Sequence, residues 1–206
     1  MSDRPPSDRP PSDRAPSDRA TGSGPAEPAT TALSRVWYRP LVPSDLPAVS
    51  ALHASAFGPG RFARAAYRVR EGTPPISPYC RGAFRDGRLL AALRMTVIAI
   101  GDGRPHLLLG PLAVAADVQG QGFGKALIAD AITSSRTGTA HVGSLQESRF
   151  GIVLLVGDMP YYGRFGFKPV PSGQITFPGP VNPARILAIE CQPGALARAV
   201  GLVRGV

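Results

Sequence analysis

Residues 117–128 read Asp-Val-Gln-Gly-Gln-Gly-Phe-Gly-Lys-Ala-Leu-Ile, between an apolar run that predicts a strand and a pattern that predicts an amphipathic helix. Three glycines within five residues allow the backbone to approach a ligand closely, with several N–H groups pointing in one direction. At a helix N-terminus, such donors and the helix dipole favour an anion, most naturally a phosphate. The simpler interpretation is a glycine-rich loop that only connects strand to helix.

Two familiar phosphate-binding loops are excluded by spacing. A Walker A loop needs glycine five residues before the Gly-Lys pair and Ser or Thr after it, but Gln119 and Ala126 occupy those positions. A dinucleotide-binding fingerprint that starts at Gly120 needs glycine where Lys125 stands. The loop therefore belongs to neither class.

The pattern around the loop predicts an α/β domain with a mixed, mostly antiparallel sheet and helices on both faces. Before the loop we expect strands at 36–41, 82–84, 89–100 and 106–114, and helices at 46–57 and 61–70. After it we expect helices at 123–132 and 159–165, and strands at 151–156, 167–170 and 185–190. The Asp86-Gly87 pair between two apolar runs is typical of a tight hairpin turn.

Composition indicates one ordinary domain behind a tail. The chain has 206 residues, of which 43% are hydrophobic, and its first residues repeat Ser-Asp-Arg-Pro-Pro with small variations. This repeat offers nothing apolar to bury, so we expect a disordered tail at 1–32 and a single domain at 33–206. No apolar run is long enough to cross a membrane and no secretory h-region is present, so we expect a cytoplasmic protein without membrane association. Cys80 and Cys191 alone make neither a disulfide framework nor a four-cysteine metal site, and we expect no metal.

The chain is strongly basic. The chain carries +9, and because residues 1–34 carry −1, the remainder carries +10. A preference for arginine on a solvated surface explains this balance, and attraction of an anionic ligand is the alternative. Nucleic acid is the least favoured anion, because aromatic residues make up only 7% of the chain and stand mostly at core-like positions.

Two spaced motifs resemble one family. Gln119-x-x-Gly122-x-Gly124 resembles the acyl-CoA loop of the GNAT superfamily of N-acetyltransferases, and Tyr162-x-x-x-Gly166-Phe167 is similar to a second GNAT motif. The spelling from Gly157 to Phe167 is similar to that of a bacterial subgroup of predicted acetyltransferases. The order of the expected elements agrees, over about residues 35–190.

The resemblance implies a site for acetyl-CoA as acyl donor. In the family, backbone N–H groups of the loop hold the pyrophosphate of CoA, and the pantetheine arm pairs with the preceding strand. Gly110-Pro111 falls where family members bend this strand away from its neighbour. The cofactor-binding residues it implies are Leu112, Ala113, Val114, Gln119, Gly120, Gln121, Gly122, Phe123, Gly124, Lys125 and Asp158.

The resemblance also implies catalytic roles. Tyr162 stands where the family's general acid protonates the sulfur of CoA, although an aromatic residue here could simply pack. The family's base positions align with Leu108 or Gly110, which cannot accept a proton. His106 has the same side-chain parity and is our candidate, while Glu147 and Asp158 are weaker ones and a water chain would also suffice.

The function that the resemblance implies is acetyl transfer to a primary amine of a small molecule or a protein. An acyl-CoA sensor without turnover is the alternative, because no carboxylate stands on the strand before the loop. Family members often dimerise, so a homodimer is compatible with the resemblance.

Overall fold

The computed structural model describes residues 35–59, 65–101, 103–137 and 150–206. The expected tail, the first half of the helix expected at 61–70, and Glu147 lie outside the described residues. All of the described residues belong to one compact unit, 34–206.

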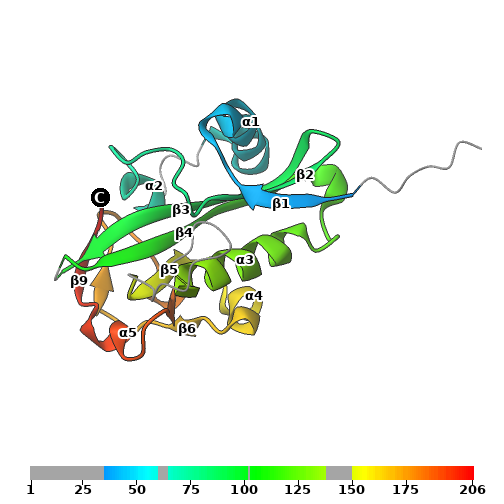
Figure 1. Ribbon diagram of the computed structural model, residues 1–206. Helices are drawn as coiled ribbons and strands as arrows, with labels where there is room; N and C mark the ends of the chain where they lie inside the picture. Colours follow the sequence, from blue (N-terminus) through cyan, green and yellow to red (C-terminus); the bar gives the residue numbers. More distant parts are fainter. Residues whose placement is uncertain (1–34, 60–64, 102, 138–149) are drawn as a thin grey trace, which may run out of the picture. The chain divides into compact units, whose positions relative to one another are not determined.

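A twisted, mostly antiparallel sheet forms the centre of this unit (Figure 1). Its main path runs β1-β2-β3-β4-β5-β8-β6, and β9 joins the far end of β3. Neighbouring strands on this path are antiparallel except β4 and β5, which are parallel. The strands are β1 Trp37–Pro40, β2 Arg81–Arg85, β3 Arg88–Ile100, β4 Pro105–Val114, β5 Ile152–Val156, β6 Lys168–Pro169, β7 Ile175–Thr176, β8 Ile186–Glu190 and β9 Gly201–Gly205.

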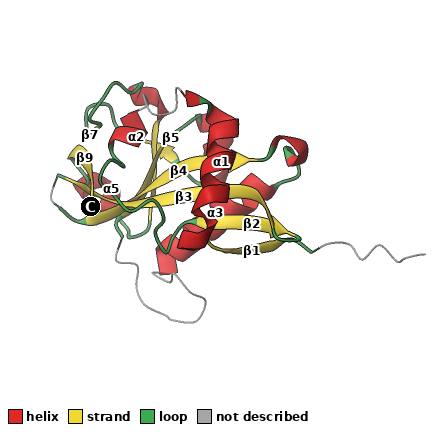
Figure 2. Cartoon of the chain, turned by 90° about the horizontal axis from the view of Figure 1, so that it is seen from above, coloured by secondary structure: helices red, strands yellow, loops and turns green. Residues whose placement is uncertain are grey.

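Helices cover both faces of the sheet, as expected. In Figure 1, α1 (Leu46–Phe57) and α2 (Ala65–Arg68) lie on one side of β3 and β4, and α3 (Phe123–Thr137) lies on the other. Figure 2 shows α1 lying across these strands in the view from above. Two short helices come later in the chain, α4 (Met159–Tyr162) after β5 and α5 (Ala195–Arg198) before β9.

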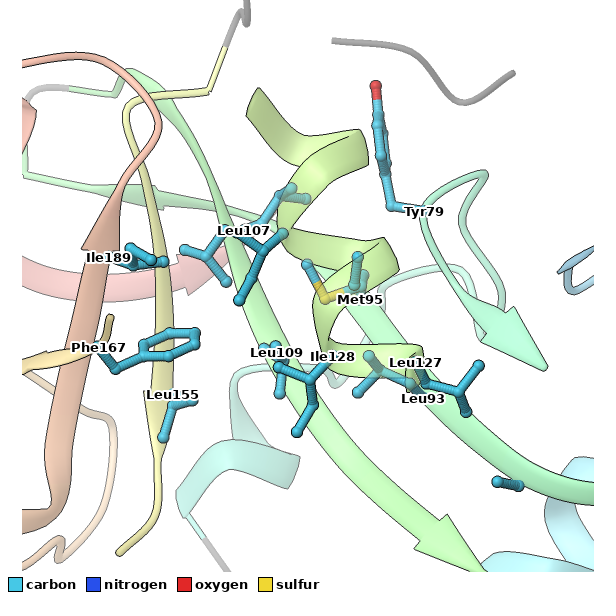
Figure 3. Close-up of a cluster of buried hydrophobic side chains, with 14 of the residues drawn as sticks. Tyr79, Leu93, Met95, Leu107, Leu109, Leu127, Ile128, Leu155, Phe167 and Ile189 are labelled. Carbon is cyan, nitrogen blue, oxygen red and sulfur yellow. The ribbon is translucent and has the colours of Figure 1, made fainter. Parts of the chain in front are cut away.

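The largest core cluster lies between α3 and the sheet. Figure 3 shows Leu127 and Ile128 of α3 in a cluster with side chains of the sheet, among them Leu93, Leu107 and Leu155. All five of these side chains are almost completely buried. This burial explains the apolar stripe of α3 and the continuous apolar run of β5. Because α3 is fixed along its length, the glycine loop at its N-terminus has a defined position.

The hairpin expected at Asp86-Gly87 is confirmed. Arg85 pairs with Arg88, and both residues between them have positive φ, 50° at Asp86 and 76° at Gly87. Positive φ at both central positions is typical of the type I′ turn, whose twist matches that of the two strands. The elements α5, β7 and β9 were not predicted, because they are short and carry no clear periodicity.

None of the helices in the described ranges is long and apolar enough to cross a membrane.

Candidate active site

The parallel strands β4 and β5 pair over only two residue positions. Leu107 pairs with Val153 and Leu108 with Leu154, although β4 continues to Val114 and β5 to Val156. The cause is a bulge in β4: Gly110 and Pro111 together stand opposite one residue of β3. A bulge bends its strand and ends regular pairing. Beyond the bulge, the backbone N–H and C=O groups on the facing edges of β4 and β5 no longer bond to each other. A ligand with amide groups can therefore bond to these edges.

A cavity of about 500 Å³ lies where the two strands separate. Its walls come from α2, from 109–112 of β4, from the last residue of β5 and the two that follow it (156–158), and from 180–182. Phe57 of α1, together with Tyr162, Arg70 and Arg185, completes the lining. The bend expected at Gly110-Pro111 is thus present, and it opens a space inside the domain.

The glycine loop lies beside the outer part of β4. Gly120 and Gly122 have φ of 79° and 91°, and α3 begins directly after them. The N–H groups of the first turn of a helix have no partners within the helix, so they and the helix dipole face the loop. Lys125 is exposed in this first turn. Within the loop, the N–H groups of Gln119 and Gln121 donate to the carbonyls of Ala116 and Val118, at 3.5 and 3.4 Å. The phosphate site expected at 119–125 stays a prediction.

Gly124 fixes the start of α3 against β4. A Cβ atom built on Gly124 would lie 3.4 Å from side-chain carbons of Leu112 and Val114 and 3.5 Å from the hydroxyl of Tyr161. The structure therefore brings the expected pantetheine strand, 112–114, next to the expected phosphate loop, 119–125. The Gln119 side chain connects the two by donating to the carbonyl of Val114 at 3.4 Å.

Tyr162 lines the cavity from the C-terminal side of β5. Its ring packs edge-on against Phe167, with ring centroids 6.0 Å apart. Burial, together with the nearby Tyr161 and Asp158, raises the pKa of the Tyr162 hydroxyl to about 12. The hydroxyl is therefore protonated throughout the physiological range and can act as a proton donor.

Tyr161 has different surroundings from Tyr162. Its ring packs against Phe165 and stands edge-on to Tyr162, with centroids 6.0 and 4.9 Å apart. It does not line the cavity, and its hydroxyl lies at the first turn of α3. Of the two adjacent tyrosines, the one singled out by the sequence motif is the one at the cavity.

Asp158 is held by an ion pair at the cavity wall. Its carboxylate accepts from Arg185, with Nε–Oδ1 at 3.1 Å and Nη2–Oδ2 at 3.3 Å. We expected Asp158 among the cofactor-binding residues, and it does line the cavity beside Tyr162.

His106 lies at the other end of the sheet from Tyr162. Its Nδ1 accepts the backbone N–H of Ile152, and its ring lies against Gly151 just before β5, whereas Tyr162 lies against Gly157 just after β5. Six residues of extended chain separate these glycines by roughly 20 Å. His106 lines a separate cavity of about 210 Å³ and is 2% exposed. Side-chain parity gives the face of β4 on which His106 stands but not its distance along the strand. The structure does not bring His106 to Tyr162, the candidate acid.

Arg70, like Arg185, lines the cavity and was not predicted from the sequence. It follows α2 and is 5% exposed, with its guanidinium beside the β4 bulge. The domain is rich in arginine throughout, so no local pattern distinguishes Arg70 from an exposed arginine. A buried position for such a residue requires contacts from distant segments.

No three His, Cys, Asp or Glu side chains within the described ranges are placed to hold a metal ion.

Comparison with a library of protein families matches residues 46–146 to the acetyltransferase (GNAT) family. No curated protein matches the sequence.

Several solved structures share the fold. The GNAT family N-acetyltransferase YhbS from Escherichia coli, in complex with CoA, is 22% identical, with a TM-score of 0.65 over 88% of this chain and 93% of that one. A GNAT family acetyltransferase from Brucella melitensis, in complex with acetyl-CoA, is 22% identical, with a TM-score of 0.56 over 78% and 90%. Naa50 from Arabidopsis thaliana, in complex with a bisubstrate analogue, is 14% identical, with a TM-score of 0.51 over 75% and 98%.

Proposed function

Because the chain carries a GNAT-family acetyltransferase domain at residues 46–146, we propose that it transfers an acetyl group from acetyl-CoA to a primary amine. The observation that carries this proposal is the separation of β4 from β5, with Tyr162 in the space between them and the glycine loop alongside. CoA has a phosphate-rich end, an arm with two amides and a terminal thioester. The three parts of the site match this order of chemical groups.

The diphosphate of CoA binds at the loop in this proposal. Backbone N–H groups of Gly120 and of 122–124 donate to it, while those of Gln119 and Gln121 donate within the turn, and the N-terminal dipole of α3 adds attraction. Lys125 contributes a positive charge from the first turn. The amides of the pantetheine arm pair with the backbone of Leu112 to Val114, as an added strand would. The complexes of the two bacterial proteins with CoA and acetyl-CoA support this assignment by shared fold.

Tyr162 acts as the general acid. The donor supplies an activated acyl group: the amine nitrogen forms a bond to the carbonyl carbon, and the carbon–sulfur bond breaks. The hydroxyl of Tyr162 gives its proton to the departing sulfur and is reprotonated from solvent. Within the described part of the cavity no histidine is present and the one carboxylate, Asp158, is paired with Arg185, so the amine proton leaves through water.

A binding protein without turnover is the second candidate, and the cavity favours the enzyme over it. A protein that only binds acyl-CoA needs the glycine loop and β4. It does not need the protonated hydroxyl of Tyr162 where β4 and β5 separate. The cavity of about 500 Å³ also offers a second ligand room beside the end of the donor.

Calorimetric titration with acetyl-CoA tests the binding site. Gly120→Asp places a carboxylate where the diphosphate binds, and Gly173→Asp is the matched control. Both glycines have φ of +79° and open space around the Cβ position, so the backbone cost is equal. We expect micromolar binding by the parent and the control, and at least a tenfold loss in Gly120→Asp.

Thiol release with a panel of primary amines then separates the two candidates. Binding with acceptor-dependent release of CoA supports the enzyme, and binding without release for any amine supports the sensor. A folded parent that does not bind acetyl-CoA would overturn both.

A further inference from the structure

Arg70 places a positive charge inside the cavity. Its Nε donates to the hydroxyl of Thr96 at 3.3 Å, its Nη1 donates to the carbonyl of Ala66 at 2.6 Å, and its Nη2 donates to the carbonyl of Gly110. These acceptors come from α2, β3 and the β4 bulge, so the guanidinium is fixed in direction. A guanidinium has five N–H groups, and these three bonds leave two of them for another partner.

None of the described residues supplies a carboxylate to Arg70. The groups that act on its charge are Arg94, Tyr67 and Cys80, and Arg94 is itself positive. The one carboxylate that lines the described part of the cavity is Asp158, which is paired with Arg185. The cavity therefore has one uncompensated positive charge.

An uncompensated buried charge is costly for a protein. Desolvation and the repulsion from Arg94 lower the pKa of Arg70 to about 9, which still leaves it charged at neutral pH. Carbonyl and hydroxyl acceptors offset part of this cost, but a carboxylate in a paired geometry would offset more. A methionine would fill the same space without this cost, so the charge itself requires an explanation.

We propose that the acyl acceptor carries a carboxylate near its amine, as an amino acid does, and that Arg70 binds this carboxylate. The inference rests on the proposed function. In that proposal the donor arm follows β4, and Arg70 reaches the cavity from α2, where its Nη2 meets Gly110 at the point of strand separation. An acceptor that enters between α2 and β4 thus presents its carboxylate to Arg70 and its amine to the thioester.

The size and charge of the cavity are consistent with such an acceptor. About 500 Å³ is many times the volume of a single water, of roughly 30 Å³, so it holds an amino acid beside an acetyl group. Polyamines are disfavoured, because the lining has no free carboxylate in its described part and they would meet the charge of Arg70.

The binding of product analogues tests whether Arg70 recognises a carboxylate, and this test does not depend on turnover. The probes are the N-acetyl derivatives of glycine, leucine, phenylalanine and glutamate, each compared with the derivative in which the α-carboxylate is a carboxamide. They are titrated calorimetrically into the protein saturated with CoA. Because these probes have no free amine, differences in amine pKa between acids and amides do not enter.

We expect at least one acid to bind tenfold or more tightly than its amide, as a charged hydrogen-bonded pair would give. Arg70→Met should bring the acid-to-amide ratio close to one without abolishing CoA binding. Arg70→Lys should retain part of the preference, because it keeps the charge but not the planar donor pair. Arg94→Met is the control, since Arg94 is a neighbouring arginine outside the cavity lining, and it should keep the preference.

Failure of this inference is distinguishable from failure of the proposed function. If CoA binds but no acid is preferred over its amide, or if the preference survives in Arg70→Met, Arg70 only supports the β4 bulge and the inference is overturned. If succinyl-CoA instead binds more tightly than acetyl-CoA in an Arg70-dependent way, the carboxylate belongs to the donor and the acceptor assignment is wrong. If CoA itself does not bind to the folded protein, it is the proposed function that fails.

Discussion

The ring of Tyr162 lies directly against the backbone of Gly157. A Cβ atom built on Gly157 would come within 2.3 Å of Cε2 and 2.7 Å of Cδ2 of Tyr162. The ring also packs edge-on against Tyr161 and Phe167, so it has little room to move away. The ring can take this orientation because Gly157 has no side chain, and we expect Gly157 to act as a positioning residue for the proposed acid.

We expect Gly157→Ala to lower kcat by roughly 10- to 100-fold, because a displacement of about 1 Å at a reacting group has effects of this size. The KM for acetyl-CoA should change much less, since the loop and β4 are untouched. Steady-state thiol release measures both. Gly163→Ala is the control: its Cβ would meet only the flexible end of Met159, at 2.8 Å, and a shift of that methyl group is cheap. Equal losses of kcat in both variants would contradict the positioning role.

Tyr162→Phe should lower kcat by about 100-fold or more, which is the usual contribution of a general acid. The ring and its packing remain, so the affinity for acetyl-CoA should stay within a few-fold of the parent. Tyr161→Phe removes the neighbouring hydroxyl, which lies outside the cavity, and should leave kcat nearly unchanged. Rapid-quench measurement of the acyl-transfer step, with calorimetry for binding, distinguishes the two variants. A Tyr162→Phe enzyme with parental kcat would show that this residue only packs.

The raised pKa of Tyr162 determines how activity changes at high pH. A general acid must be protonated, and a pKa of about 12 keeps the hydroxyl protonated well above pH 10. Activity should therefore rise with pH as the acceptor amine loses its proton, and deprotonation of Tyr162 should cause no fall up to about pH 11. The profile of kcat against pH, with enzyme stability checked at each point, measures this. Arg70, whose pKa is about 9, loses its charge in the same range, so the profile is compared with that of Arg70→Met. A fall centred near pH 9 to 10 that persists in Arg70→Met would mean that the acid is another group.

Local features of this site were predictable from the sequence, and long-range ones were not. The Asp86-Gly87 turn and the glycine loop need particular backbone angles, and those angles restrict the residue types within a few positions. The role of Tyr162 as a site residue was predicted from the Tyr-x-x-x-Gly-Phe motif. The spacing of this motif corresponds to the short helix α4 and the turn that follows it after β5. Each of these features is encoded by residues that are neighbours in sequence.

Arg70 and His106 show why the rest could not be predicted. The burial of Arg70 depends on acceptors from Thr96 and Gly110, which are 26 and 40 residues away in sequence. His106 was placed on the correct strand, but alternation along a strand gives only the face and not the distance from the site. The strand β9 is held at the end of β3, about 100 residues earlier in the chain, and its own residues carry no strand pattern.

The ion pair between Asp45 and Arg39 should make stability depend on pH. The carboxylate of Asp45 accepts from both Nη atoms of Arg39, at 2.7 and 2.8 Å, and from the N–H of Val42 at 2.8 Å. The bond from Arg39 is the main cause that lowers the pKa of Asp45. A lowered pKa stabilises the fold above the unfolded-state pKa of about 4, and this stabilisation is lost as pH falls through the folded-state pKa.

We therefore expect Asp45→Asn to cost about 1 kcal/mol of unfolding free energy at pH 7, because the pair is partly exposed. The difference from the parent should shrink as the pH falls below about 4. Urea denaturation at a series of pH values measures it. A difference that stays constant with pH would mean that the cost of the substitution comes from packing and not from the charge.

The close approach of Gly101 to the C-terminal segment supplies a test of how β9 is held. A Cβ atom on Gly101 would lie 1.8 Å from the carbonyl oxygen of Val200, whereas one on Gly103 would have no atom within 4 Å. Both glycines have positive φ, 53° and 76°, so alanine at either position costs about 1 kcal/mol or more from the backbone alone. Gly101→Ala must in addition push the segment before β9 away from β3, and we expect its total loss to exceed that of Gly103→Ala by roughly 2 kcal/mol. Urea denaturation compares the two variants, and hydrogen exchange at Arg204 and Val206, whose N–H groups face β3, reports on the β9 pairing directly. Equal losses and unchanged exchange would show that β9 is held independently of this contact.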